Sequence, residues 1–182
     1  MLRITLLSGE ELTSIAVEDV HDVKALKQQL NKMYGLPPRF RQRLLHDGQT
    51  LDDAFNLDLP MDLQVVLTTF AEPSDSQKEQ LFFAARDGFV SEVQALLQLP
   101  MDPDARDEEG STPLMKASTN GHADIAELLL EAGAEKDSCD RGGFTALIYA
   151  ALRGHAQVVQ LLLLAGAQKD VADHRGSTAL MR

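Results

Sequence analysis

The sequence has almost none of the residues that build covalent or metal cross-links. Its 182 residues include one cysteine, Cys139, and no tryptophan. A single thiol can form neither an internal disulfide nor a multi-cysteine zinc site, and it suits a reducing compartment. We expect Cys139 to be a small surface or half-buried residue, and we predict no metal site and no cofactor.

Long hydrophobic runs are missing as well. The longest, residues 161–167, is far below the roughly 18 residues that a membrane-spanning helix requires. The opening stretch, MLRITLLSGEE, has too short an apolar segment for a secretory signal. These two absences predict an intracellular protein, cytoplasmic or nuclear, that has no membrane partner.

Basic residues are too few to balance the acidic ones. The chain has 17 Lys and Arg against 28 Asp and Glu, which gives a formal net charge of −11. Such an excess repels the phosphates of nucleic acids and anionic membrane surfaces. We therefore do not expect nucleic acid to be a partner.

Arginine is concentrated in one stretch only, LPPRFRQRLLHDG, residues 36–48. If this stretch is a strand, Arg39, Arg41 and Arg43 point alternately to its two faces and form no continuous positive surface. We interpret them as a solvated local patch that can meet acidic protein surfaces. The dipeptide Asp47-Gly48 is typical of a turn.

An internal repeat dominates the second half of the chain. The segment DEEGSTPLMKASTNGHADIAELLLEAGAEKDSCD, from Asp107, returns as DRGGFTALIYAALRGHAQVVQLLLLAGAQKDVAD, from Asp140, with a period of 33 residues. Each copy predicts a turn, a short helix and a second, apolar helix. Glycines mark the predicted helix ends, at Gly121, Gly133, Gly154 and Gly166.

This repeat resembles the ankyrin repeat, and the likeness covers residues 77–182. Thr112, Pro113 and Leu114 keep the family's T-P-L-H-like signature, whereas Met115 and Ile148 stand where the family usually has histidine. The resemblance implies an all-α solenoid of about three repeats and a fourth that stops inside its first helix. Proteins with such repeats bind other proteins.

The first of these repeats lacks the turn signature. It begins with Ser76 and Glu79 at the spacing of a capping box, which indicates an amino-terminal cap of the array. We expect residues 71–76 to be a linker to the preceding domain.

The first seventy residues follow a different pattern. Alternating apolar residues on both sides of Ser8-Gly9 predict a β-hairpin. Asp22 can cap a helix that Gly35 ends, and two more strand-like stretches follow, residues 42–46 and 63–69. The predicted order is strand, strand, helix, strand, strand.

That order resembles ubiquitin and its β-grasp relatives, as do the motifs GLPP at 35–38 and QRLL at 42–45. The resemblance covers residues 1–70 and implies an α+β β-grasp fold. It also implies a recognition patch at Leu7, Leu45 and Val66, and partners in the ubiquitin system. Because no Gly-Gly follows Phe70, we expect that this domain is not conjugated to lysines.

Residues suited to catalysis do not cluster in the sequence. His122 and His155 each follow a repeat glycine at the 33-residue period, so we interpret them as structural positions of the repeat. We predict that the protein is not an enzyme.

The array offers a better-supported surface. The first helices and turn tips of such a stack are free to contact partners. Tyr149 is the predicted anchor, because aromatic side chains beside arginine are enriched in interfaces. The predicted binding residues of the array are Phe83, Arg86, Lys116, Thr119, Arg141, Phe144, Tyr149, Leu152 and Arg153.

The predicted function is that of a monomeric adaptor or scaffold that binds other proteins of unknown identity. Two alternatives stay open. In one, the chain is the amino-terminal regulatory region of a longer enzyme or channel that continues beyond Arg182, which the incomplete fourth repeat favours. In the other, it is a structural scaffold without a defined ligand.

Overall fold

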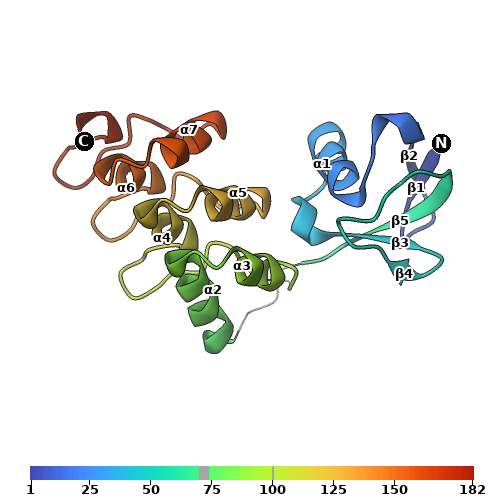
Figure 1. Cartoon of the computed structure of the whole chain (residues 1–182), viewed down its shortest axis with the longest axis horizontal. Coiled ribbons are helices and arrows are strands. Elements are labelled where there is room, and N and C mark those ends of the chain that lie inside the picture. The colour runs from blue at the N-terminus through green and yellow to red at the C-terminus, as the bar shows by residue number, and fades with distance from the viewer. Residues whose placement is uncertain (70–73, 100) are drawn as a thin grey trace. The chain divides into compact units, whose positions relative to one another are not determined.

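The computed structural model describes residues 1–69, 74–99 and 101–182. Contacts divide the chain into two compact units, Met1–Phe70 and Ala71–Arg182 (Figure 1). Residues 71–73 of the predicted linker lie outside the described residues. Its last two residues are helical, because helix α2 spans Asp75–Asp87, so the predicted linker is too long at that end.

The first unit is a five-stranded mixed sheet with one long helix (Figure 1). The strand order is β2-β1-β5-β3-β4, and β1 and β5 are parallel while the other neighbours are antiparallel. The strands are β1 (Leu2–Leu6), β2 (Glu11–Ile15), β3 (Gln42–His46), β4 (Gln49–Thr50) and β5 (Met61–Leu67). The predicted hairpin and the strand at 42–46 are confirmed, and the last strand starts two residues earlier than predicted.

Helix α1 (Val23–Tyr34) packs its apolar stripe on one face of this sheet. Leu26 and Leu30 are fully buried together with Ile4 and Leu44 of the strands. The predicted cap is confirmed, since Asp22 Oδ1 accepts a hydrogen bond of 2.7 Å from the Ala25 backbone N–H. The opposite face of the sheet is left without a covering helix among the described residues of this unit.

The arginine-rich stretch departs from its prediction. Residues Arg39–Arg41 form a 3-10 helix ahead of β3, and the Arg39 side chain is buried rather than solvated. Asp53 accepts hydrogen bonds from both Arg39 Nη1 and Lys27 Nζ, the latter at 2.8 Å. Burial of Arg39 thus follows from a shared counter-ion, which the sequence places fourteen residues away. Arg43, in β3, stays exposed as predicted.

The second unit is a stack of three helix pairs (Figure 1). The first helices α2, α4 and α6 contact one another in chain order, and the second helices α3, α5 and α7 form the other layer. No helix in the described ranges is long and apolar enough to cross a membrane. The remaining helices are α3 (Val90–Leu97), α4 (Pro113–Asn120), α5 (Ala123–Glu131), α6 (Ala146–Leu152) and α7 (Ala156–Leu164), followed by a 3-10 turn, Ala179–Met181.

The capping box of the first repeat exists, but two residues earlier than predicted. The Ser74 side chain accepts a hydrogen bond from the Gln77 backbone N–H, and Gln77 Oε1 accepts one of 3.0 Å from the Ser74 backbone N–H. Ser76 already lies in the first helical turn. Gln77, at the third helical position, accepts this hydrogen bond as a glutamate would. Glu79 therefore takes no part in the capping box.

Carboxylates of the connecting loops join each repeat to the next. Both oxygens of Asp104 lie 3.0 Å from the Glu135 backbone nitrogen, and Asp137 Oδ1 accepts from Gln168 N–H at 2.8 Å. Arg106 adds a bond of 2.8 Å to the carbonyl of Cys139. These loops are therefore structural ties between repeats.

Asp104 makes the stability of the second unit depend on pH. Burial raises its pKa to about 6 from an ordinary 3.8, and the hydrogen bond from Glu135 opposes the rise only in part. The folded protein then keeps a proton that the unfolded chain releases, so this contribution to stability is present below about pH 4 and is lost as the pH rises to about 6. We expect Asp104→Asn to abolish this decrease in the free energy of unfolding between about pH 4 and 6, as measured by urea denaturation at a series of pH values. A carboxyl-carbon NMR titration of Asp104 with a midpoint near 4 would contradict the assignment.

Candidate functional site

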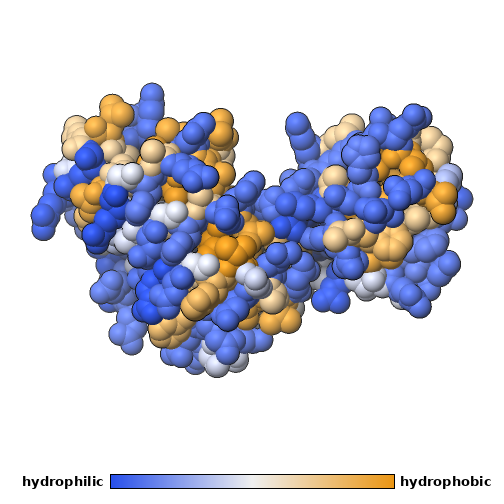
Figure 2. Space-filling model, viewed as in Figure 1, coloured by the Kyte–Doolittle hydropathy of each residue, from blue (hydrophilic) through white to orange (hydrophobic). Residues whose placement is uncertain are grey.

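The predicted binding residues of α2, α4 and α6 lie on one layer of the stack, which we call the first-helix face. Phe83 and Leu152 are 52% and 45% exposed, although both are large and apolar. Lys116, Thr119 and Tyr149 are half-buried. Figure 2 shows apolar side chains reaching the surface of this unit among hydrophilic ones.

Three aspartates, which we call the turn carboxylates, build the loops ahead of α4, of α6 and of the 3-10 turn Ala179–Met181. Oδ1 of Asp107 accepts hydrogen bonds from the backbone N–H groups two and four residues later. Asp140 and Asp173 repeat the arrangement, with distances of 2.8 and 2.9 Å in both. In the second, third and incomplete fourth repeats, one carboxylate oxygen is thus used to fix the turn.

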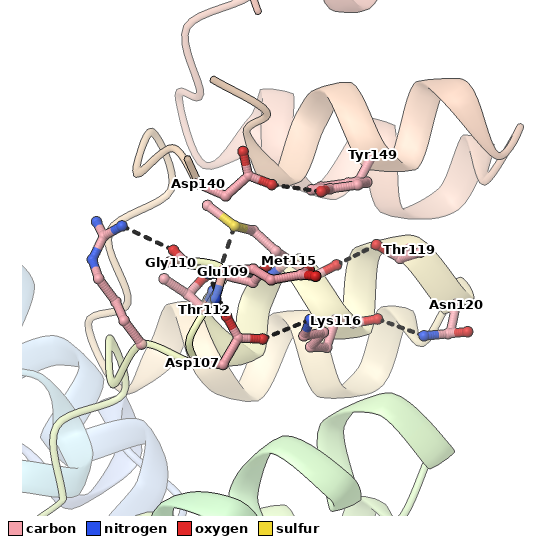
Figure 3. A network of polar contacts seen from close by, with 12 residues as sticks. Asp107, Glu109, Gly110, Thr112, Met115, Lys116, Thr119, Asn120, Asp140 and Tyr149 are labelled. Atoms are coloured by element: carbon pink, nitrogen blue, oxygen red, sulfur yellow. Dashed lines mark hydrogen bonds and ion pairs between the residues drawn. The ribbon is translucent and has the colours of Figure 1, made fainter. Parts of the chain in front are cut away.

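The second oxygen of each turn carboxylate accepts from a side chain nine residues later. The donors are Lys116 Nζ at 2.8 Å, the Tyr149 hydroxyl at 2.5 Å and Arg182 Nη2 at 2.8 Å. Figure 3 shows the first two of these contacts, which join the turn to the first helix. This network was not predicted from the sequence. The sequence feature that could have revealed it is an aspartate that recurs every 33 residues, each time with a hydrogen-bond donor nine positions after it.

Tyr149 therefore has a structural role that its prediction as an anchor did not include. Its ring lies 5.3 Å from that of Phe144, centroid to centroid, and the side chain is half-buried. Burial, and then the hydrogen bond to Asp140, raise the pKa of its hydroxyl, so the phenol is a neutral donor. Only the exposed part of the ring is left for a partner.

Removal of the hydroxyl tests this role. We expect Tyr149→Phe to lower the free energy of unfolding by about 1.5–3 kcal/mol, because a hydrogen bond to a charged acceptor is lost while the ring contact with Phe144 is kept. Urea denaturation checks this value. The control is Tyr34→Phe, whose hydroxyl donates to the neutral Thr13 Oγ1 on an exposed site, and we expect a smaller loss there. Equal losses for the two variants would contradict the prediction.

The histidines act as the sequence analysis predicted. Nε2 of His122 lies 2.9 Å from the carbonyl oxygen of Arg86, and Nε2 of His155 lies 3.1 Å from that of Thr119. Because a carbonyl only accepts, both nitrogens donate, and each histidine links the start of one second helix to the preceding repeat. The Thr119 hydroxyl is also used internally, as a donor to the Met115 carbonyl at 2.7 Å.

Met115 occupies the place of the signature histidine and takes part in the helix start. The Thr112 backbone N–H donates to Met115 Sδ at 3.4 Å, and the Met115 N–H donates to Thr112 Oγ1 at 3.4 Å. Both side chains are almost fully buried. The threonine at this position is therefore kept in a capping role, although its usual partner is absent.

A pocket of about 400 Å³ opens on the first-helix face between the first and second repeats, and we call it the Phe83 pocket. Its lining residues are Glu79, Phe82, Phe83, Arg86, Asp107 and Lys116. The Arg86 guanidinium lies 4.8 Å from the centre of the Phe83 ring. Arg86 also pairs with Asp87 through two contacts of 2.7 and 3.0 Å, which lower the pKa of the aspartate.

The structure thus brings Phe83, Arg86 and Lys116 together. Phe144 contacts Tyr149 one repeat further along. The other predicted residues of the array do not line the Phe83 pocket: Arg141 is exposed in a turn, where its backbone N–H donates to the Glu109 carbonyl at 3.0 Å, and Leu152 and Arg153 are exposed at the end of α6.

Two residues of the predicted patch, Leu45 and Val66, lie on the uncovered face of the sheet in the first unit. Leu45 is paired with Gln64 across β3 and β5, and Val66 with Arg43. Leu7 directly follows β1 and is 68% exposed. A shallow cleft of about 380 Å³ adjoins Leu45 and Gln64.

In the part of the chain that the structure describes, no three His, Cys, Asp or Glu side chains are grouped so that they could hold a metal ion. Cys139 is free and exposed.

Comparison with known families gives one match. A family model of ankyrin repeats matches residues 81–173, in three copies. A search of curated proteins finds no match.

Proposed function

Because the chain belongs to the ankyrin-repeat family, whose repeats generally mediate protein–protein interaction, we propose that it is a non-enzymatic adaptor that binds a partner protein through the first-helix face. The turn carboxylates, the histidine links and the loop carboxylates join the backbone of each repeat to that of its neighbour beneath this face. A backbone that is already ordered before binding lowers the entropy that binding costs.

One observation carries this proposal. Phe83 leaves about half of its surface in water at the edge of a pocket, while the core of the same repeat is fully closed by Leu81 and Ala84. A half-exposed aromatic ring beside an arginine is the composition that binding hot spots favour.

We further propose that the first unit is a ubiquitin-like domain and a second interaction module. The order of its five strands and its single long helix support this identity. Leu45 and Val66 lie on the uncovered face, and the exposed Leu7 directly follows β1, the neighbour of β5; this supports a recognition patch for proteins of the ubiquitin system. The sequence TTFAEPSDS after the last strand contains no diglycine, which supports a domain that is not conjugated.

Site-specific cross-linking tests the binding face. A photo-reactive phenylalanine analogue replaces Phe83 in the full chain, and the protein is irradiated in a cell lysate. The control carries the analogue at Phe89, which is also 52% exposed but does not line the Phe83 pocket. We expect a defined cross-linked protein from position 83 that is absent from position 89. Equal products from both positions, or none from position 83, would argue against this face.

A further inference from the structure

The cations and the carboxylates that line the Phe83 pocket differ in whether they are paired. Both cations that line it already have acidic partners, because Arg86 pairs with Asp87 and Lys116 Nζ lies 2.8 Å from Asp107 Oδ2. Glu79, on α2, is exposed, and within the described residues it makes no hydrogen bond or ion pair. Counted over the residues that the structure describes, the lining of the pocket therefore has one carboxylate, that of Glu79, without a cation paired to it.

The rest of the second unit adds to the negative charge at the pocket. Residues 71–182 contain 10 Lys and Arg against 18 Asp and Glu. Two further acidic residues, Glu108 and Glu109, follow Asp107 in the same turn, and both are exposed. A basic ligand is attracted to such a field, and an acidic one is repelled.

The floor of the pocket is apolar. Phe82 is half-buried, Phe83 is half-exposed, and the flat Arg86 guanidinium lies against the Phe83 ring. A second apolar side chain placed on this ring would remove both surfaces from water. The lining of the pocket thus combines two aromatic rings with the carboxylate of Glu79.

From this combination we infer that the Phe83 pocket binds a short protein segment with an apolar side chain flanked by lysine or arginine. The apolar side chain packs on Phe83, and the flanking cation pairs with Glu79. This inference rests on the proposed function, since it names the chemistry of the partner at the same face.

An acidic segment fits less well. It would have to pair with Arg86, which would then lose its contact with Asp87, or with Lys116, which would then lose its contact with Asp107. Loss of the Lys116 pair would also expose a turn carboxylate that fixes the second repeat. The existing ion pairs therefore select against acidic ligands.

Two short fluorescent peptides test the inference with the full chain. The first has a central phenylalanine between two lysines, with serine and glycine elsewhere, and the second has glutamates in place of the lysines. We expect the basic peptide to bind about tenfold more tightly by fluorescence anisotropy, and less tightly as salt is added. It should shift the amide NMR signals of Glu79, Phe83 and Arg86.

Variants locate the binding. Phe83→Ala should weaken the basic peptide about tenfold, as loss of an aromatic anchor does. Glu79→Gln should weaken it about threefold and reduce its salt dependence, as expected for an exposed ion pair. The matched controls are Phe89→Ala, with the same 52% exposure as Phe83, and Glu92→Gln on the second helix α3, and both should leave the affinity unchanged.

Other outcomes overturn the inference in distinguishable ways. Tighter binding of the acidic peptide, lost in Phe83→Ala, would reverse the partner's charge but leave the proposed binding face intact. Binding that all four variants leave unchanged would place the peptide elsewhere on the protein. Absence of binding by either peptide would refute the inferred chemistry, and the cross-linking at position 83 would then decide the proposed function on its own.

Discussion

Asp53→Asn should destabilise the first unit by about 3 kcal/mol or more, the largest effect that we expect from a single polar substitution in this chain. Asp53 is the shared acceptor of Lys27 and Arg39, whose side chains are 5% and 2% exposed. An amide cannot balance two cations that are almost completely withdrawn from water. The cost of their burial then remains while the attraction that offset it is lost.

Urea denaturation followed by NMR measures this effect separately in each unit. Amide signals of Leu44 and Val65 report on the sheet, and that of Ala117 reports on the repeats. We expect the midpoint to fall for the sheet and to stay unchanged for the repeats. Asp58→Asn is the control, because Asp58 is exposed and no hydrogen bond or ion pair is seen for its side chain within the described residues. Similar midpoints for the two variants would show that the buried cluster contributes little.

Gly121→Ala should destabilise the second unit by about 3 kcal/mol, for two reasons that add. Gly121 has a φ of +78°, where an L-residue costs about 1–2 kcal/mol. A Cβ atom there would lie 2.6 Å from Nδ1 of His155, so the ring must move and its hydrogen bond to the Thr119 carbonyl is broken. Because the Thr119 carbonyl is part-buried, the loss of its donor adds about 1 kcal/mol or somewhat more.

Gly154→Ala separates the conformational cost of a positive φ from the cost of displacing the histidine ring. Gly154 is the equivalent residue one repeat later and has a φ of +73°, but no atom lies within 4 Å of a Cβ built on it. We therefore expect a loss of only about 1 kcal/mol, the conformational part alone. In the double variant Gly121→Ala/His155→Ala the loss should be smaller than the sum of the single losses. Equal losses for Gly121→Ala and Gly154→Ala would mean that the histidine contact has no energetic weight.

Periodicity explains why so much of the second unit was predictable. A spacing of 33 residues repeats helix, glycine and histidine positions together, so each copy supports the interpretation of the others. In the first unit the alternation of Leu2 and Ile4 and the cap at Asp22 act over a few residues, and short-range patterns of this kind are visible in a sequence. These elements were predicted correctly in type.

The incorrect predictions share one cause, because each depends on a contact that forms only in the folded chain. Arg39 was predicted to be solvated because its counter-ion, Asp53, approaches it only in the folded sheet domain. Tyr149 was predicted to be a free anchor because its bond to Asp140 depends on how the turn folds back on the helix. The capping box was misplaced because Ser74 and Ser76 both stand near a suitable partner, and sequence spacing alone does not choose between them.

Candidate binding residues were the least predictable. Position in the repeat placed Phe83, Arg86 and Lys116 on one face, but their meeting in one pocket depends on the contact between α2 and α4. That Glu79 has no ion-pair partner in the described part of the chain can be seen only when the partners of the neighbouring charges are known. The sequence contains the charges, and the fold decides which of them remain uncompensated.

The turn carboxylates have a consequence for the evolution of the face. An amine, a phenol and a guanidinium occupy the same place in three successive repeats, and each satisfies the same oxygen of an aspartate. The requirement is for a donor and not for a particular residue. Mutation at this position can therefore exchange a positive charge for an aromatic ring on the surface while the backbone beneath it keeps its hydrogen bonds. One column of the array is in this way free to diversify toward new ligands without first having to find a compensating change elsewhere.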